Sequence, residues 1–243
     1  MMLEIEKLSA FYGKTKVLDN INLCFEKGKF YTVIGRNGSG KSTLVHCISG
    51  IKEYEGRIVC GGDDITKLSA ADRAKRISLL PQQVLPAPFT VYELCSFGRN
   101  PHGDIRNSRE KIASALEKAN VSHLSEKRVD EISGGERQLS YFAMNICQDA
   151  DTILLDEPTA NLDMDYESKI LSCAKEMCKS GKTVICVMHN LSQAVKYADE
   201  IVLLDKGRCI FSGSVKNCLD TNSIENNFGV RRHESEGQIF FSI

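Results

Sequence analysis

The residues with the clearest chemical content are eight consecutive ones that begin at Gly35. Residues 35–42 read GRNGSGKS and match the pattern G-x-x-x-x-G-K-[ST]. Glycines let successive backbone N–H groups point into one concavity, and a helix that follows adds the positive end of its dipole. Lys41 then reaches the β- and γ-phosphates of a nucleotide, and Ser42 places its hydroxyl on Mg²⁺. This phosphate loop predicts a set of nucleotide-contacting residues: Gly35, Asn37, Gly38, Ser39, Gly40, Lys41, Ser42 and Thr43.

A pair of acids forms the second candidate. The run Thr152–Leu155 is apolar and ends in Asp156 and Glu157. Asp156 is suited to hold Mg²⁺, directly or through water, and Glu157 to polarise an attacking water. Strands often end in acids, so this motif is weak by itself. It gains weight because it follows a phosphate loop in the same chain.

Residues 133–138, SGGERQ, form the third candidate. Ser133 and Glu136 fit a capping box at the start of a helix whose apolar stripe begins at Leu139. A simple cap explains these two residues. Gly134 and Gly135 indicate more, because they leave the helix N-terminus bare enough for an anion to approach its N–H groups.

The elements that must position these motifs can be read from apolar periodicity. The phosphate loop follows an expected strand and opens an expected helix that carries Leu44, Cys47, Ile48 and Ile51 on one side. Lys206-Gly207 is expected to turn a hairpin. Strands are expected at 2–8, 20–26, 30–34, 57–60, 152–155, 183–188, 201–204 and 209–211, and further helices at 108–119, 139–147 and 165–179.

This order predicts one α/β domain with a parallel core and an inserted helical lobe. The core comprises residues 1–83 and 149–243, and the lobe comprises residues 84–148, entered near Pro86-Ala87-Pro88. Buried parallel strands explain the fully apolar runs at 152–155 and 183–188.

Composition excludes some classes of function. The chain has 243 residues, 31 Lys and Arg against 32 Asp and Glu, and a formal net charge of -1, so no basic excess suggests nucleic-acid binding. No apolar run is long enough to span a bilayer, and no secretory signal is visible, so we expect a cytoplasmic protein. The ten cysteines are scattered singly, several of them in apolar runs (Cys24, Cys47, Cys147 and Cys186), which favours reduced core thiols over disulfides.

With these motifs in place, the chain resembles the ABC ATPase family from about residue 3 to residue 230. The family signature, Leu-Ser-Gly-Gly-Gln/Glu, reads Ile132-Ser133-Gly134-Gly135-Glu136 here, and Ile for Leu keeps an apolar side chain. The resemblance implies a P-loop NTPase core with a parallel sheet, an N-terminal antiparallel β subdomain and a helical subdomain that bears this signature segment, residues 132–136.

The resemblance also implies roles for single residues. Tyr12 would stack on adenine, Gln82 would link metal and water, and His189 would contact the γ-phosphate. Asn161-Leu162-Asp163 would cross a dimer interface, and Asn190 stands where many relatives carry Asp. A lone Tyr, Gln or His is more often a packing or surface residue. These assignments therefore depend on the residues occurring along the chain in the same order as the corresponding elements of the family.

The mechanism that the resemblance implies needs two copies. Two domains would pair head to tail, and the phosphate loop of one and the signature segment of the other would enclose each ATP with Mg²⁺. Loss of the γ-phosphate would reopen this homodimer. The movement would drive a separate transmembrane permease, with the chain peripheral on the cytoplasmic side of the membrane and an extracytoplasmic substrate-binding protein as an indirect partner.

A narrower similarity concerns the cargo. Residues 81–83, 90–94, 98–101 and 228–230 are similar to ATPases of importers for iron siderophores, haem and cobalamin. Import of another metal or solute, export, and a soluble assembly factor without a permease remain alternatives. A module that binds ATP without hydrolysing it is disfavoured by Glu157 and His189. Arg99 and Pro101 either contact a permease or shape a loop.

Overall fold

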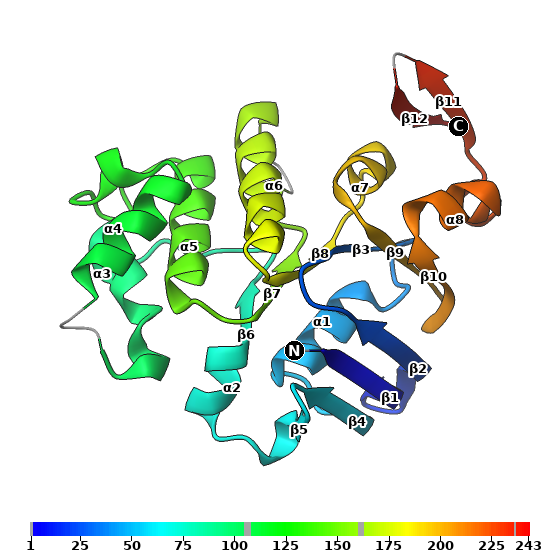
Figure 1. Cartoon of the computed structure of the whole chain (residues 1–243), viewed down its shortest axis with the longest axis horizontal. Coiled ribbons are helices and arrows are strands. Elements are labelled where there is room, and N and C mark those ends of the chain that lie inside the picture. Colours follow the sequence, from blue (N-terminus) through cyan, green and yellow to red (C-terminus); the bar gives the residue numbers. More distant parts are fainter. Residues whose placement is uncertain (1, 105–107, 160–162, 236) are drawn as a thin grey trace.

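The computed structural model describes residues 2–104, 108–159, 163–235 and 237–243. Figure 1 shows strands in the middle and at one side of the molecule, with helices around them. The strands are β1 (Leu3–Tyr12), β2 (Thr15–Phe25), β3 (Phe30–Gly35), β4 (Glu55–Cys60), β5 (Asp63–Asp64), β6 (Ile77–Leu80), β7 (Thr152–Asp156), β8 (Thr183–Val187), β9 (Glu200–Asp205), β10 (Arg208–Ser214), β11 (Arg231–Ser235) and β12 (Gln238–Ser242). The α-helices are α1 (Lys41–Ser49), α2 (Ala70–Arg76), α3 (Val91–Phe97), α4 (Arg109–Lys118), α5 (Gly134–Gln148), α6 (Met164–Lys179), α7 (Leu191–Tyr197), α8 (Val215–Asp220) and α9 (Ser223–Phe228).

A six-stranded sheet in the order β10-β9-β3-β8-β7-β6 forms the centre of the fold. All its neighbours pair in parallel except β9 and β10, which form the hairpin expected around Lys206-Gly207. Every residue of β3, β7 and β8 is buried. These runs are mostly apolar because both faces of the sheet are covered, so the predicted parallel α/β core is confirmed.

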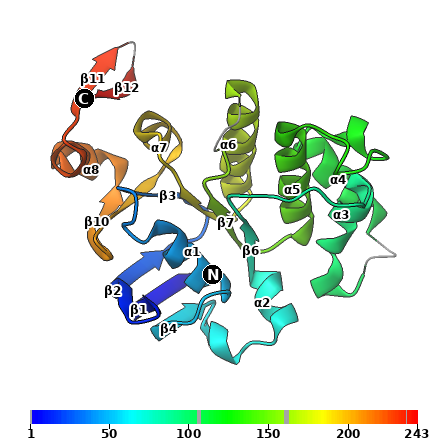
Figure 2. The ribbon, with the colours of Figure 1, turned by 180° about the vertical axis from the view of Figure 1, so that it is seen from behind.

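Successive residues of these strands point into two different cores. Phe30 and Ile34 pack with the helical region, whereas Tyr31 and Val33 pack with α1 and the antiparallel sheet β2-β1-β4-β5. This alternation is the ordinary consequence of the two-residue period of a strand. Figures 1 and 2 show the antiparallel sheet on one side of the central strands and α3–α5 at one end of the molecule.

The helical region is organised by a buried guanidinium. Arg99 follows α3 and is completely buried. It donates to both carboxylate oxygens of Asp104, at 3.1 and 2.9 Å, and to the carbonyl oxygen of Cys147 at 2.8 Å. The guanidinium holds the pKa of Asp104 well below its usual range. Of the two readings left open for Arg99, the structure supports the shaping of a loop. Pro101 lies beside it in a short 3₁₀ turn and is partly exposed.

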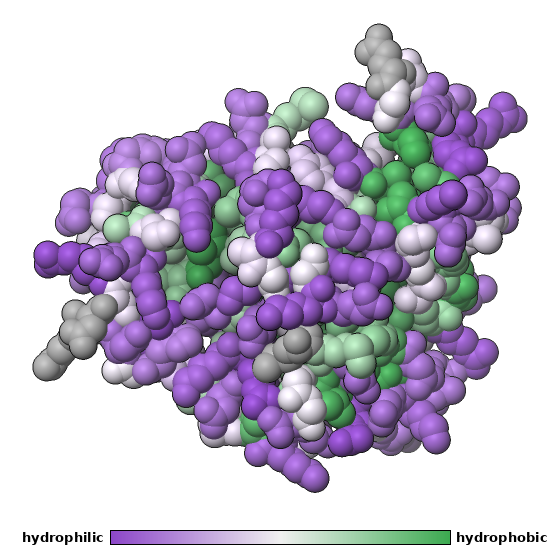
Figure 3. Space-filling model, in the orientation of Figure 1, coloured by the Kyte–Doolittle hydropathy of each residue, from purple (hydrophilic) through white to green (hydrophobic). Residues whose placement is uncertain are grey.

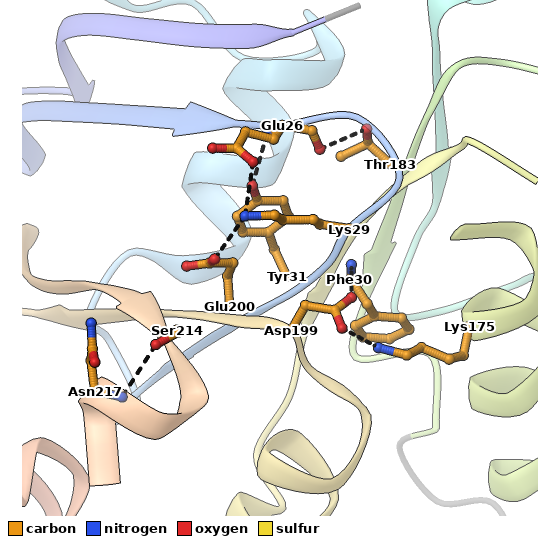
Figure 4. A network of polar contacts seen from close by, with 10 residues as sticks. All are labelled: Glu26, Lys29, Phe30, Tyr31, Lys175, Thr183, Asp199, Glu200, Ser214 and Asn217. Carbon is orange, nitrogen blue, oxygen red and sulfur yellow. Dashed lines mark hydrogen bonds and ion pairs between the residues drawn. The ribbon is translucent and has the colours of Figure 1, made fainter. Parts of the chain in front are cut away.

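A polar network fixes the amino end of β3, opposite the phosphate loop (Figure 4). The Asp199 carboxylate accepts from the backbone N–H of Phe30 at 2.8 Å and from Lys175 Nζ at 2.7 Å. Lys29 bridges Glu26 and Glu200, and these hydrogen bonds hold its pKa above the usual range. The strand that carries the loop is therefore held at its far end.

Some expectations are wrong in detail. Ile51 lies beyond the end of α1 and is 71% exposed, because Gly50 takes a left-handed conformation and ends the helix. Cys24 is exposed rather than a core thiol, because it lies on the outer face of β2. All ten cysteines fall in the described ranges, and none forms a disulfide.

Other elements were not anticipated, among them β6 and the terminal hairpin of β11 and β12. This hairpin projects from the main body in both ribbon views (Figures 1 and 2). Hydrophilic side chains cover most of the face in Figure 3. In the part of the chain that the structure describes, none of the helices combines the length and the apolar character needed to cross a membrane.

Candidate nucleotide site

The carboxyl ends of neighbouring parallel strands bring the predicted site residues together. The phosphate loop follows β3, Glu157 follows β7, His189 comes shortly after β8, and Gln82 comes shortly after β6. Because these strands are adjacent and parallel, their ends open on the same edge of the sheet. One pocket at this edge is lined by Val17, Asn37, Gly38, Gly40, Lys41, Ser42, Thr43, Gln82, Glu157 and His189.

The phosphate loop has the backbone of an anion cradle. Gly38 and Gly40 both have positive φ, and a Cβ at Gly40 would lie 2.6 Å from the Leu18 side chain. Only glycine fits there without strain. Gly40 is the N-cap of α1 and provides no side chain to cap it, so the helix end is open to an anion. Ser39 Oγ is buried and has no hydrogen-bond partner among the described residues, which leaves it available to a bound group.

Lys41 is held inside the site by backbone oxygens. Its Nζ donates to the carbonyl oxygens of Gly35 at 2.9 Å and Arg36 at 3.2 Å. Burial lowers the pKa of Lys41, while the charges of Glu157 and Asp156 act in the opposite direction. Lys41 forms no ion pair with any of the residues that the structure describes. A buried ammonium with only carbonyl partners suits a phosphate ligand, because the phosphate supplies the missing negative charge.

Oxygen donors meet where a divalent cation would bind. Ser42 Oγ donates to Asp156 Oδ1 at 3.0 Å, across the gap between α1 and β7. His46, one turn further along α1, places Nε2 3.6 Å from Asp156 Oδ2. Burial raises the pKa of Asp156, which Ser42 and His46 partly counteract. Hydroxyl, carboxylate and amide oxygens from Ser42, Asp156 and Gln82 are the hard ligands that Mg²⁺ prefers, so this donor set fits the metal.

Glu157 is held from both sides by the two residues assigned through the resemblance. Gln82 Nε2 donates to Glu157 Oε2 at 2.7 Å, and His189 Nε2 lies 2.5 Å from Glu157 Oε1. The Glu157 side chain is largely buried at the pocket wall. The three residues therefore form one polar cluster beside the phosphate loop, and all three line the same pocket.

Tyr12 lies outside this pocket lining. It ends β1, is 52% exposed, and has the Lys52 ammonium 4.1 Å from its ring centroid. Val17, on β2, lines the pocket instead. Neither Val17 nor His46 was anticipated, because a Val on a strand and a His on a helix carry no motif of their own.

The signature segment is also outside the pocket lining. Ser133 Oγ accepts from Glu136 N at 3.3 Å, and the Glu136 carboxylate accepts from Ser133 N at 2.9 Å, so the capping box is confirmed. This contact lowers the pKa of Glu136. A Cβ at Gly134 would meet no atom within 4 Å, which leaves the start of α5 open at this residue. Asn161 and Leu162 lie outside the described residues, while Asp163 occupies the N-cap position of α6 without a side-chain capping hydrogen bond.

The chain is similar to known proteins over most of its length. The sequence profile of a family described as ABC transporter matches residues 18–160. The petrobactin import ATP-binding protein YclP of Bacillus subtilis (strain 168) is 36% identical, over 92% of this chain and 91% of that protein. The ferric enterobactin transport ATP-binding protein FepC of Escherichia coli (strain K12) is 33% identical, over 93% and 86%. The hemin import ATP-binding protein HmuV of Pseudomonas fluorescens (strain Pf0-1) is 34% identical, over 97% of each.

The fold is also similar to that of a solved structure. A solved structure of a nucleotide-free ATP-binding cassette from an ABC transporter superposes with a TM-score of 0.81 at 26% identity. The match covers 93% of this chain and 98% of that one.

Proposed function

The chain belongs to the ABC transporter family and is an ATP-binding ATPase, and we propose that it energises import of an iron chelate, haem or cobalamin through a separate membrane permease. The observation that carries the catalytic part is the Glu157 carboxylate, held between Gln82 and His189 beside the phosphate loop. The cargo class rests on the relatives, which are named for import of petrobactin, ferric enterobactin and hemin.

In the proposed site, the backbone N–H groups of the phosphate loop and the Lys41 ammonium bind the phosphates of ATP. Ser42, Asp156 and Gln82 would hold Mg²⁺, which neutralises charge on the β- and γ-phosphates when it is bound. Glu157 orients the attacking water and accepts its proton. His189 keeps Glu157 in place and donates toward the γ-phosphate. Adenine stacks on the Tyr12 ring once the Lys52 ammonium has moved away from the face of that ring.

A complete site requires a second copy of the chain. Ser133, Gly134, Gly135 and Glu136 form an open helix start that is not part of the pocket in the same chain. In a head-to-tail homodimer this helix start meets the γ-phosphate held by the phosphate loop of the partner. Hydrolysis removes the charge that both helix ends bind, and the dimer then opens.

The division into subdomains follows from the same proposal. Residues 84–148, which contain α3, α4 and α5, move as the lobe that carries the signature segment, and residues 1–83 and 149–243 form the nucleotide-binding core. The lobe and the Gln82 region transmit this movement to the permease on the cytoplasmic side of the membrane, where the chain is a peripheral subunit. A substrate-binding protein on the other side delivers the cargo.

Affinity capture tests the transport part of the proposal. The tagged chain is isolated from detergent-solubilised membranes of its own cells, and the proteins that copurify are identified by mass spectrometry. We expect a polytopic permease together with a substrate-binding protein for an iron chelate, haem or cobalamin. Capture of soluble proteins alone would contradict a transport function while leaving the ATPase intact.

A further inference from the structure

The backbone at Glu157 is in an unusual conformation. Its φ is +49°, in the left-handed region that side chains with a Cβ rarely adopt. Such a conformation persists only when the surroundings hold it, and it is concentrated at functional sites. One restraint is local, because Glu157 N–H donates to the carbonyl oxygen of Val187 at 3.2 Å. The next residue, Pro158, has no backbone N–H, so its backbone can form a hydrogen bond only through the carbonyl oxygen.

That carbonyl oxygen receives a side chain from the signature helix. Gln138 Nε2 donates to the oxygen of Pro158 at 3.2 Å, and the Gln138 side chain is 6% exposed. Gln138 lies on α5, in the first two turns of the helix and just after Glu136, the last residue of the signature segment. A buried amide cannot exchange this partner for water at no cost, so the contact fixes Pro158 relative to α5.

The same end of α5 also contacts the element that follows Pro158. A Cβ at Gly135 would lie 3.0 Å from the ring of Tyr166, on α6. The first turns of α5 therefore contact both Pro158, next to Glu157, and Tyr166 on α6. A shift of α5 would disturb both contacts, because packed interiors have little free volume.

We propose that Gln138 is a positioning residue that couples the signature helix to the catalytic carboxylate of the same chain. Its amide holds the Pro158 carbonyl, and through it the left-handed backbone of Glu157, in the arrangement that aligns the carboxylate with water. When the start of α5 binds the ATP held by the partner copy, the hydrogen bond between Gln138 and Pro158 transmits this binding to Glu157 of the same chain as Gln138. The inference rests on the proposed role of Glu157 and adds a second residue that controls it.

The alternative is that Gln138 only stabilises the fold, and α5 offers a matched control. Further along the helix, Asn145 Oδ1 accepts from Ser78 Oγ of β6 at 2.9 Å, and both side chains are buried. Ser78→Ala removes a buried hydrogen bond between α5 and a neighbouring element without touching the Glu157 segment. Gln138→Met removes the donor while keeping the length of the side chain, and Gln138→Glu keeps its shape.

The test measures turnover, ATP affinity and melting temperature of the full-length variants. We expect both Gln138 variants to lose about tenfold in kcat with ATP affinity unchanged, because a small misplacement affects the reaction more than binding. Ser78→Ala is expected to lower the melting temperature and keep kcat. If one Gln138 variant fails to fold, the other still separates kcat from affinity.

Two outcomes overturn the proposal. One is a kcat within twofold of the original for a folded Gln138 variant. The other is a parallel loss of kcat and affinity that follows the loss of folded protein, as a purely structural contact produces. Near-normal turnover in Glu157→Gln is a different failure, because it removes the assigned catalytic role of Glu157 and not the contact made by Gln138.

Discussion

The residues of the site differ in how readily the sequence reveals them. Lys41 and Ser42 belong to a short continuous motif whose chemistry is local. Asp156 and Glu157 form a motif that is weak by itself, and their place beside the phosphate loop was predicted only because that loop precedes them in the chain. Gln82, by contrast, is a lone residue, and its place in the cluster followed only from a family resemblance. Val17, His46 and Gln138 act through contacts between distant segments, which no local pattern encodes.

The buried carboxyl of Asp156 lowers the stability of the folded chain when no ligand is bound. Burial raises the pKa of this carboxyl, so the charged form is less favourable in the folded chain than in the unfolded one. The folded state then binds the proton more tightly. Stability therefore falls as pH rises from the ordinary carboxyl pKa through the raised one, and above the raised pKa the full penalty is present.

Asp156→Asn should remove this penalty. We expect the variant to be more stable than the original by roughly 0.5–2 kcal/mol at pH 7 without nucleotide, and to lose the Mg²⁺-dependent gain in ATP affinity. Thermal unfolding at pH 7 and near pH 4 checks it, because the difference should shrink as Asp156 becomes protonated. Asp220→Asn, at an exposed position, serves as the control. A variant less stable than the original at pH 7 would show that burial is not the dominant influence on Asp156.

Helices and strands were predicted well where their apolar residues follow a clear pattern along the sequence. The buried runs of β7 and β8 were located within one residue, because length and β-branched composition identify a covered strand. The four-residue strand β6 was missed because its apolar run directly continues a helix. The hairpin of β11 and β12 was missed because the side chains of β11 are all exposed and give no alternation.

At the amino end of β3, Asp199→Ala should lower the free energy of unfolding by about 1 kcal/mol or more, because the backbone N–H of Phe30 loses its acceptor. Asp199→Asn keeps an oxygen acceptor and loses only the ion pair with Lys175, so it should lose less. Denaturant unfolding compares the two. Turnover per folded molecule should be unchanged in both, since the network lies at the opposite end of β3 from the phosphate loop. Equal losses would assign the effect to the ion pair instead.

At the scale of the whole molecule, the nucleotide pocket and the signature segment lie apart within one chain. The pocket contains the phosphate loop, Gln82, Glu157 and His189, while the signature segment opens elsewhere on the surface. The sequence supplied both halves as motifs, but the way in which two copies meet depends on surfaces, which motifs do not describe. In the proposed mechanism, dimerisation driven by ATP is therefore the property that connects these residues to transport.

The most direct test is ATP hydrolysis by Glu157→Gln, with the size of the protein measured by light scattering in the presence of ATP and Mg²⁺. Lys41→Ala serves as the control that lacks the phosphate contact. The account predicts that Glu157→Gln binds ATP, loses at least about 100-fold in turnover because the attacking water has no base, and accumulates as a dimer. Lys41→Ala should remain a monomer with little bound ATP. Turnover by Glu157→Gln close to that of the original chain would contradict the catalytic role of Glu157.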